Sequence, residues 1–288
     1  MKSILKVSIS VFVVSILMST FVLAKEKIVV FPFIGISSTS KYNGDDGTYG
    51  TSKIAENCMI DILVATKQFE VVERAALTKI IEEQKLSLTG AINAEDAVQV
   101  GNLLGASYAV IGSISEASFK MEYGDRGTQK STGHVTIQLR IVSISTGSIL
   151  FSESFQRGTG IFDIFSGSPK AEDLLGGYVK GVFDGDVKNK TRQWFPLRGY
   201  VLSVNAKTET IMIDLGSELA VKKDDRFWVL SVIEKIHPKT KKKIRIENRI
   251  GKVRVEEVQG KEASIARIED GKDKILVGGD SMEIEREQ

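Results

Sequence analysis

The sequence has little of the residue types that build disulfides, catalytic triads and histidine-rich metal sites. Its 288 residues include one cysteine and two histidines. A single cysteine cannot form a disulfide within the chain, so stability is expected to come from a hydrophobic core. His134 and His237 have no evident partner in the sequence and are interpreted as surface or hairpin residues. We therefore predict no enzyme activity, no catalytic residue, no cofactor and no metal site.

The sequence also lacks an excess of charge of one sign. Its 39 lysines and arginines nearly balance 37 aspartates and glutamates, which leaves a formal charge of +2. Such a chain has no global field that attracts nucleic acid or an anionic membrane surface, so no nucleic-acid partner is expected. The 42% hydrophobic content is ordinary for a folded protein, and the length predicts about one or two domains.

The glycine-rich segment Gly44–Lys53 lacks the residue order of a phosphate-binding loop. Such a loop needs Gly-Lys-Ser/Thr, in which the lysine reaches the outer phosphates and the hydroxyl holds magnesium. Here Thr51 and Ser52 precede Lys53. We interpret the segment as a flexible loop that leads into a helix capped by Thr51 or Ser52.

The first 24 residues differ from the rest of the chain. Lys2 and Lys6 precede an apolar run that extends from Val7 to Leu23. This order predicts a cleaved signal peptide over residues 1–24, and a retained transmembrane anchor is the alternative that the length permits. No cysteine follows the expected cleavage point, so a lipoprotein signal is not expected. The mature chain is expected in the periplasm, where it could associate with the outer membrane or the cell wall.

Residues 25–190 alternate between strand and helix patterns and predict an α+β or α/β domain with a mixed sheet and flanking helices. Asn93 is expected to cap one of these helices. Cys58 falls at helical spacing among apolar residues and is interpreted as a buried thiol rather than a nucleophile. The expected elements are strand 27–33, helix 51–67, strand 69–72, helix 73–84, helix 94–104, strand 106–114, the hairpin of 133–142 with 149–155, and helix 170–183.

Beyond Leu197 the helical period disappears and short strands follow one another at close intervals. This spacing predicts a small all-β barrel over residues 197–288. The boundary between the two domains is expected near Asn189 to Pro196, a polar segment that ends in Trp-Phe-Pro. The expected barrel strands begin near Gly199, Thr210, Asp225, Arg249 and Ala263.

Two surfaces are candidates for partner binding. The first is an apolar loop in a glycine-rich stretch, and its candidate contact residues are Ile161, Phe162, Ile164 and Phe165. The second is the one strong local charge feature, a basic run whose candidate residues are Lys239, Lys241, Lys242 and Lys243. Such a run could contact phosphate groups or an acidic partner, and the alternative is a solvated hairpin tip.

Several of these patterns together resemble the curli-assembly CsgG-type family of bacterial envelope proteins. The resemblance spans roughly residues 27–183. It is carried by Glu73-Arg74 at the start of one helix and Glu83-Gln84 at its end, by Leu104-Gly105-Ala106 before a strand that ends in Gly112, and by Ser145-Thr146-Gly147 at a hairpin turn. The barrel, with Gly199-Tyr200-Val201 and Lys223-Asp224-Asp225-Arg226-Phe227, resembles the C-terminal domain of flagellar assembly protein T.

The family resemblance implies a protein that acts without catalysing a reaction. It implies pores that export curli subunits, activators of peptidoglycan synthases, or periplasmic proteins that build flagellar collars. From it we expect a periplasmic assembly or accessory factor that binds an envelope protein and also itself, as a homo-oligomer. The alternative is an outer-membrane secretion channel subunit.

The channel alternative requires membrane-crossing hairpins with an apolar side chain at every second position on both arms. One candidate hairpin, in segment 115–135, has an outgoing arm with apolar side chains from Ala117 to Tyr123, but its return arm from Thr128 to Gly133 has none. In the second candidate, segment 151–183, Glu153 and Arg157 share a strand face with Phe155. The sequence therefore favours the accessory factor.

Overall fold

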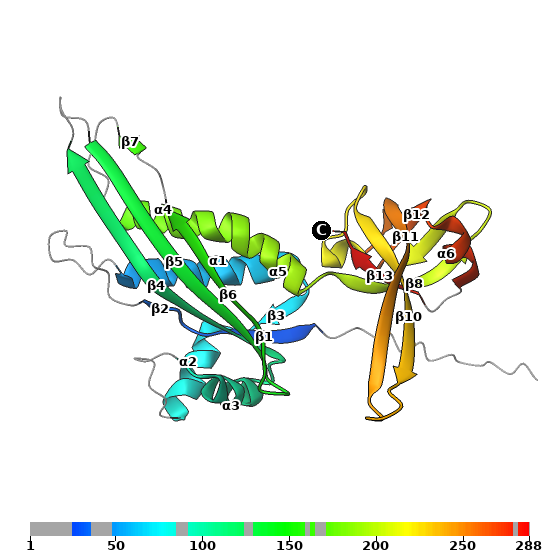
Figure 1. Ribbon diagram of the computed structural model, residues 1–288, viewed down its shortest axis with the longest axis horizontal. Helices are drawn as coiled ribbons and strands as arrows, with labels where there is room; N and C mark the ends of the chain where they lie inside the picture. The colour runs from blue at the N-terminus through cyan, green and yellow to red at the C-terminus, as the bar shows by residue number, and fades with distance from the viewer. Residues whose placement is uncertain are drawn as a thin grey trace, which may run out of the picture.

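The computed structural model describes residues 25–35, 48–84, 92–123, 129–158, 162–164, 171–278 and 282–287. The expected signal peptide and the first part of the glycine-rich segment, residues 44–47, lie outside these ranges, as do Ile161 and Phe165. Figure 1 shows a long sheet flanked by helices, followed by a barrel of short strands. Both parts of the predicted fold class are confirmed.

The first part of the chain builds a seven-stranded mixed sheet in the order β3-β1-β4-β5-β6, with β2 paired to β4 and β7 paired to β5. Strands β3, β1 and β4 run parallel, and β4, β5 and β6 run antiparallel. The strands are β1 (Glu26–Val30), β2 (Ile34–Gly35), β3 (Phe69–Val71), β4 (Tyr108–Tyr123), β5 (Gln129–Ser143), β6 (Ile149–Gly158) and β7 (Phe162–Ile164).

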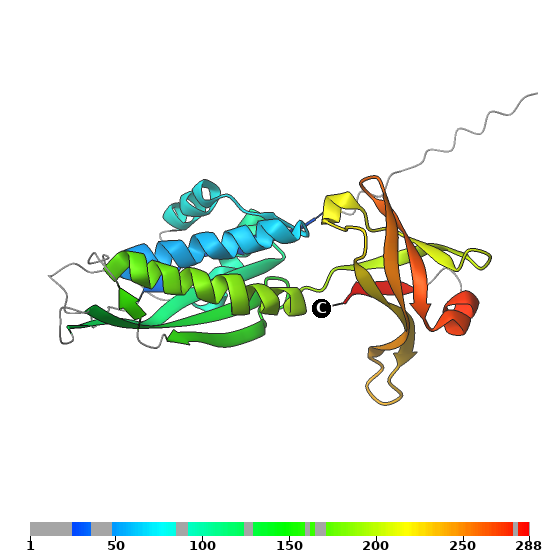
Figure 2. The same ribbon diagram turned by 90° about the horizontal axis from the view of Figure 1, so that it is seen from above.

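Helices cover both faces of this sheet. One face packs against α1 (Thr48–Thr66) and α4 (Ala171–Val182), which lie side by side in Figure 2. The other face packs against α2 (Arg74–Glu83) and α3 (Ala94–Leu104). The near-continuous apolar strand β1 supplies both cores, because alternate side chains point to opposite faces: Ile28 and Val30 join one core, and Val29 and Phe31 join the other.

Local signals in the sequence correctly placed several of these elements. The amide of Asp96 donates to the side chain of Asn93 at 2.7 Å, so the predicted cap of α3 is confirmed. The helix ends at Gly105, whose φ of 66° is the left-handed conformation that glycine adopts most readily. Helix α1 begins at Thr48, three residues before Thr51, so the expected cap at Thr51 or Ser52 is wrong.

Two elements of the first part extend further than predicted. Strand β4 does not end at residue 114, nor at Gly112 as in the motif of the family resemblance, but continues to Tyr123, because β5 pairs with it along its whole length. After α4 the chain continues without a break through a π-helical turn (Phe183–Val187) into α5 (Lys188–Trp194). The segment expected to form a polar boundary is therefore helical, and Trp194 packs in the core of the sheet against Phe151 and Phe155.

The second part of the chain closes into a barrel in the order β10-β11-β12-β9-β8-β13. Its core is separate from the two cores of the sheet and begins at Leu197. The barrel strands are β8 (Arg198–Asn205), β9 (Thr210–Ile213), β10 (Arg226–Ile236), β11 (Lys243–Gln259), β12 (Ala263–Asp270) and β13 (Glu283–Arg286), with a 3-10 turn at Ser217–Leu219 and the helix α6 (Lys272–Gly278). Strand β13 and helix α6 were not predicted.

None of the described helices is both long enough and apolar enough to cross a membrane.

Candidate binding surface on the β10–β11 hairpin

The predicted basic run lies in a hairpin that projects from the barrel. Strand β13 pairs with β10 only over Phe227–Leu230, and β12 pairs with β11 only from Lys252 onward. Beyond these points β10 and β11 pair with each other alone, as far as Ile236 and Lys243. Figure 1 shows this free part, in yellow and orange, extending away from the barrel.

The strand register divides the free part of the hairpin into two faces. Ile233 lies opposite Ile246, and Lys235 lies opposite Ile244. Residues opposite each other in an antiparallel pair share a face, and neighbours along a strand alternate. We call the side with Ile233, Lys235, Ile244 and Ile246 the apolar face. The other side, which we call the ionic face, carries Glu234, Lys243, Arg245 and Glu247 together with Val232 and Ile236.

Three isoleucines make the apolar face exposed and hydrophobic. The exposed fraction is 43% for Ile233, 41% for Ile244 and 36% for Ile246. Single exposed apolar side chains are common on proteins, but three on one narrow hairpin face form a patch. The patch offers a partner apolar surface without any rearrangement of the barrel.

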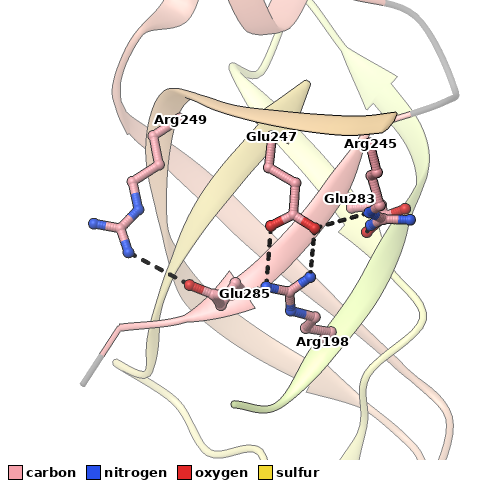
Figure 3. Close-up of polar contacts among 6 residues, drawn as sticks. All are labelled: Arg198, Arg245, Glu247, Arg249, Glu283 and Glu285. Carbon is pink, nitrogen blue, oxygen red and sulfur yellow. Dashed lines mark hydrogen bonds and ion pairs between the residues drawn. The ribbon is translucent and has the colours of Figure 1, made fainter. Parts of the chain in front are cut away.

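The ionic face is tied to strands β8 and β13 by paired charges, shown in Figure 3. The Arg198 guanidinium of β8 donates to both carboxylate oxygens of Glu247, at 2.8 and 3.1 Å, and to Glu285 of β13 at 2.6 Å. Arg245 donates to Glu247 at 2.8 Å and also to Glu283 of β13. The hairpin is therefore held against the barrel wall on its ionic face, while its apolar face remains exposed.

The charges of this network stabilise one another. Hydrogen bonds from Arg198 and then Arg245 hold the pKa of Glu247 below its usual value, and the bond to Glu247 is the largest cause that raises the pKa of Arg198. At the base of the hairpin, Arg249 pairs with Glu285 at 3.4 Å and lies 4.9 Å from the centre of the Trp228 ring. Glu247 is thus a carboxylate at neutral pH and keeps both arginines in place.

The tip of the hairpin is a compact basic turn. The backbone amide of His237 donates to the Lys242 carbonyl at 2.8 Å, and the amide of Thr240 donates to Nδ1 of His237 at 3.0 Å. Lys243 pairs with Glu234 at 3.3 Å. Within the described ranges, no carboxylate pairs with the ammonium groups of Lys235, Lys239, Lys241 or Lys242. The tip therefore presents uncompensated positive charge beside the apolar face.

The two predicted contact surfaces lie far apart. The basic run forms the tip of the β10–β11 hairpin, whereas Phe162 and Ile164 belong to β7, at the opposite end of the molecule in Figure 1. The expected apolar loop is in part a strand, because β7 pairs with Gln129–Ser131 of β5. The other two residues of that loop, Ile161 and Phe165, are outside the described residues.

Sequence reasoning found the basic tip but missed the apolar face beside it. The signal was present, since Lys243-Ile244-Arg245-Ile246-Glu247 alternates charged and apolar residues as a strand with two different faces does. Placing Ile233 beside Ile246 required the register of β10 on β11. The network partners Arg198, Glu283 and Glu285 had no signal in the sequence, because they come from distant strands.

Two other side chains considered from the sequence, His134 and Cys58, belong to the sheet part of the chain. Nε2 of His134 lies 3.1 Å from the Thr136 hydroxyl and 3.6 Å from a Glu116 carboxylate oxygen. Cys58 is half-buried rather than buried, and burial, followed by the charges of Asp184 and Asp61, raises the pKa of its thiol. Among the described residues, no group of three or more histidine, cysteine, aspartate or glutamate side chains is placed to hold a metal ion.

Comparison with solved structures finds partial likenesses at low identity. The C-terminal domain of LpoB from Escherichia coli is 17% identical over 49% of this chain and 88% of that chain, with a TM-score of 0.32. The hypothetical protein CT253 from Chlamydia trachomatis is 16% identical over 60% of this chain and 99% of that chain, with a TM-score of 0.39. Lipoprotein GNA1162 from Neisseria meningitidis is 18% identical over 57% of this chain and 99% of that chain, with a TM-score of 0.34. At these values the likeness says nothing about function.

Comparison with curated protein sequences finds no match. A comparison with protein families matches residues 19–171 to the family described as curli production assembly/transport component CsgG. The matched range is more than half of the 288 residues and includes β1 to β7. The resemblance of the barrel to the C-terminal domain of flagellar assembly protein T stays a prediction. The chain belongs to the CsgG family of curli production assembly/transport components.

Proposed function

We propose that this protein is a non-enzymatic assembly or accessory factor of the bacterial cell envelope, which acts in the periplasm by binding other proteins. The observation that carries the proposal is membership of a family whose description names assembly and transport. The geometry agrees with binding, because the β10–β11 hairpin holds an exposed apolar face and a basic tip in a fixed position. A preformed surface of this kind lowers the entropy cost of ordering side chains and backbone when the partner binds.

Self-association is part of the proposal. Strand β6 is the last strand of the sheet, with β5 on one side and no strand on the other among the described residues. Its span of 10 residues is long for an unprotected edge, and unpaired backbone groups on such an edge can accept a strand from a second chain. This edge supports the expected homo-oligomer. Association with the outer membrane or the cell wall would follow from the partner that the oligomer binds.

An outer-membrane secretion channel subunit is the second candidate. The observation that favours it is the β4–β5 hairpin, whose pairing continues to Tyr123 and Gln129. Two features favour the accessory factor instead. The return arm, Thr128–Gly133, has no apolar side chain, and in the described part of segment 151–183 the strands β6 and β7 each pair with β5.

Cell fractionation, followed by size-exclusion chromatography with light scattering, tests the proposal. Native cells are separated into soluble and membrane fractions, and the purified chain from Lys25 is analysed without detergent. We expect a soluble periplasmic protein that forms small oligomers. Recovery only from the outer membrane, as a large ring that needs detergent, would replace the accessory factor with the channel subunit.

A further inference from the structure

We propose that the apolar face of the β10–β11 hairpin, together with its lysine tip, binds a partner protein through a segment that carries both apolar and acidic side chains. This inference rests on the proposed function, since it supposes a protein that works by binding. It adds the place of contact and the chemistry of the partner segment.

The apolar part of the surface favours apolar side chains on the partner. Ile233 and Ile246 lie side by side across the hairpin, and Ile244 follows Ile246 on the same face of β11. Removing exposed apolar area from water favours the complex. All three isoleucines project from extended backbone, so a partner side chain can reach them from one direction.

The charged part of the surface favours carboxylate side chains on the partner. The lysines at positions 235, 239, 241 and 242 have no acidic partner within the described residues. Lys235 lies on the apolar face itself, directly opposite Ile244. A partner segment that covers the isoleucines therefore comes within reach of several ammonium groups, and acidic side chains on it complement that charge.

The order of charge and apolar surface along the hairpin favours a protein over a lipid membrane. The turn 237–242 reads His-Pro-Lys-Thr-Lys-Lys and contains no apolar side chain apart from proline. The three isoleucines of the apolar face are on the stem, behind the tip. A membrane approached tip first would meet the lysines and Ile236, which is 65% exposed on the ionic face, before any isoleucine of the apolar face. A protein segment that lies along the stem contacts both kinds of side chain at once.

The backbone favours an extended partner segment. Past Leu230 on β10, and before Lys252 on β11, the outer edges of the hairpin have no strand partner in the described part of the chain. An extended segment can add to such an edge through main-chain hydrogen bonds while its alternate side chains reach one face. The ion pairs of the ionic face keep the edge in place before the partner arrives.

A peptide tests the inference directly. The probe is a labelled peptide of about ten residues, within the usual range of strand lengths, with valine at alternate positions and glutamates grouped at one end. Its binding to the full mature chain is measured by fluorescence anisotropy, and its position by NMR of the isoleucine δ1-methyl groups. We expect binding that weakens with added salt and shifts the methyl signals of Ile233, Ile244 and Ile246. The same peptide with lysine in place of glutamate is expected not to bind.

Two double variants separate the apolar and charged contributions. Ile244→Thr with Ile246→Thr keeps strand-forming residues but removes apolar surface, and Lys241→Gln with Lys242→Gln removes tip charge. We expect each pair to weaken peptide binding at least about tenfold. The matched control is Leu202→Thr with Lys207→Gln, an exposed apolar and an exposed basic residue elsewhere on the barrel. It is expected to leave the affinity unchanged.

Three results would overturn the inference. One is unchanged peptide binding by both hairpin variants. Another is binding of phosphatidylglycerol vesicles, but not of the peptide, through the same residues, which would assign the surface to lipid. The third is a shift of the three methyl signals with protein concentration alone, because a second copy would then occupy the face. A failed peptide test leaves the fractionation result intact, and a channel found by fractionation leaves the peptide result intact, so the two failures are distinguishable.

Discussion

Single residues of the ionic face decide how firmly the hairpin is held. Glu247 accepts from Arg198 and Arg245 at once, so one carboxylate joins β8 to β11. Exposed ion pairs contribute little individually, but a bidentate arginine within a network is the geometry in which they contribute most. Glu247 is therefore the residue at which the anchoring of the hairpin can be tested.

The substitution Glu247→Gln should destabilise the protein in a pH-dependent way. The folded-state pKa of Glu247 is depressed, so its contribution is present above the unfolded pKa and is lost as pH falls through the folded one. We expect a loss of about 0.5–1 kcal/mol in the free energy of unfolding at neutral pH and a smaller loss at an acidic pH, because the carboxylate is progressively protonated as the pH falls through its folded-state pKa. Urea unfolding of both proteins at the two pH values measures this. Glu262→Gln, at an exposed position without a side-chain partner among the described residues, is the control, and an equal loss at both pH values would contradict the prediction.

Close contacts between secondary-structure elements limit which residue types can occupy a position in the sheet. Gly112 of β4 lies against the ring of Phe33, and a Cβ built at Gly112 would come within 2.2 Å of that ring. Phe33 is itself packed in the core, 6.2 Å from the Phe183 ring between centroids. The ring has little room to move, so the glycine sets how closely the segment after β1 approaches β4.

The variant Gly112→Ala should therefore be destabilised. We expect a loss of about 1–3 kcal/mol in the free energy of unfolding, because the added methyl group overpacks the core around Phe33. Chemical unfolding followed by circular dichroism measures it. Gly177→Ala is the matched control: it lies exposed in α4 with no atom within 4 Å of the new Cβ, and alanine should stabilise a helix there by up to about 1 kcal/mol. Equal stability of the Gly112 variant and wild type would show that the ring moves freely.

For the whole molecule, the hydrophobic cores indicate two units. The core of the sheet includes Trp194, and the core of the barrel begins at Leu197. An exposed ion pair at 3.7 Å between Lys25 and Glu218 links the sheet part to the barrel part. Exposed pairs of this kind contribute about 0–1 kcal/mol. We propose that the chain has two domains, as the loss of the helical period beyond Leu197 predicts, with the boundary between Trp194 and Leu197.

Two fragments test this division. The chain from residue 196 to 288 should fold alone, because the barrel is closed and has its own core. We expect dispersed NMR signals, β-type circular dichroism and one cooperative thermal transition, and the same cooperativity with mixed α/β dichroism for residues 25–195. A barrel fragment that stays unfolded until the first fragment is added would show that the two parts fold as one unit.

How much of the fold can be predicted from the sequence depends on how far apart in the chain the interacting residues are. Helix α3 was placed correctly at both ends, since its signals, Asn93 before it and Gly105 after it, act within a few residues. Strand β4 was cut short at residue 114, because its continuation depends on pairing with β5 rather than on its own residues. For the same reason α5 was taken as a linker: Trp194 is held by an aromatic cluster that includes Phe151 and Phe155, far away in the chain.

Patterns among neighbouring residues were enough to predict the fold class, the alternation of strands and helices, the barrel and the basic hairpin tip. All of these follow from local periodicity, composition and short motifs, which are properties of neighbouring residues. The surroundings of the tip depend on contacts between strands that are distant in the sequence. Arg198 meets Glu247 across 49 positions and Glu285 across 87, and these contacts hold one face of the hairpin while the other presents its isoleucines. Such contacts depend on how distant strands are placed, and no local pattern in the chain encodes that placement.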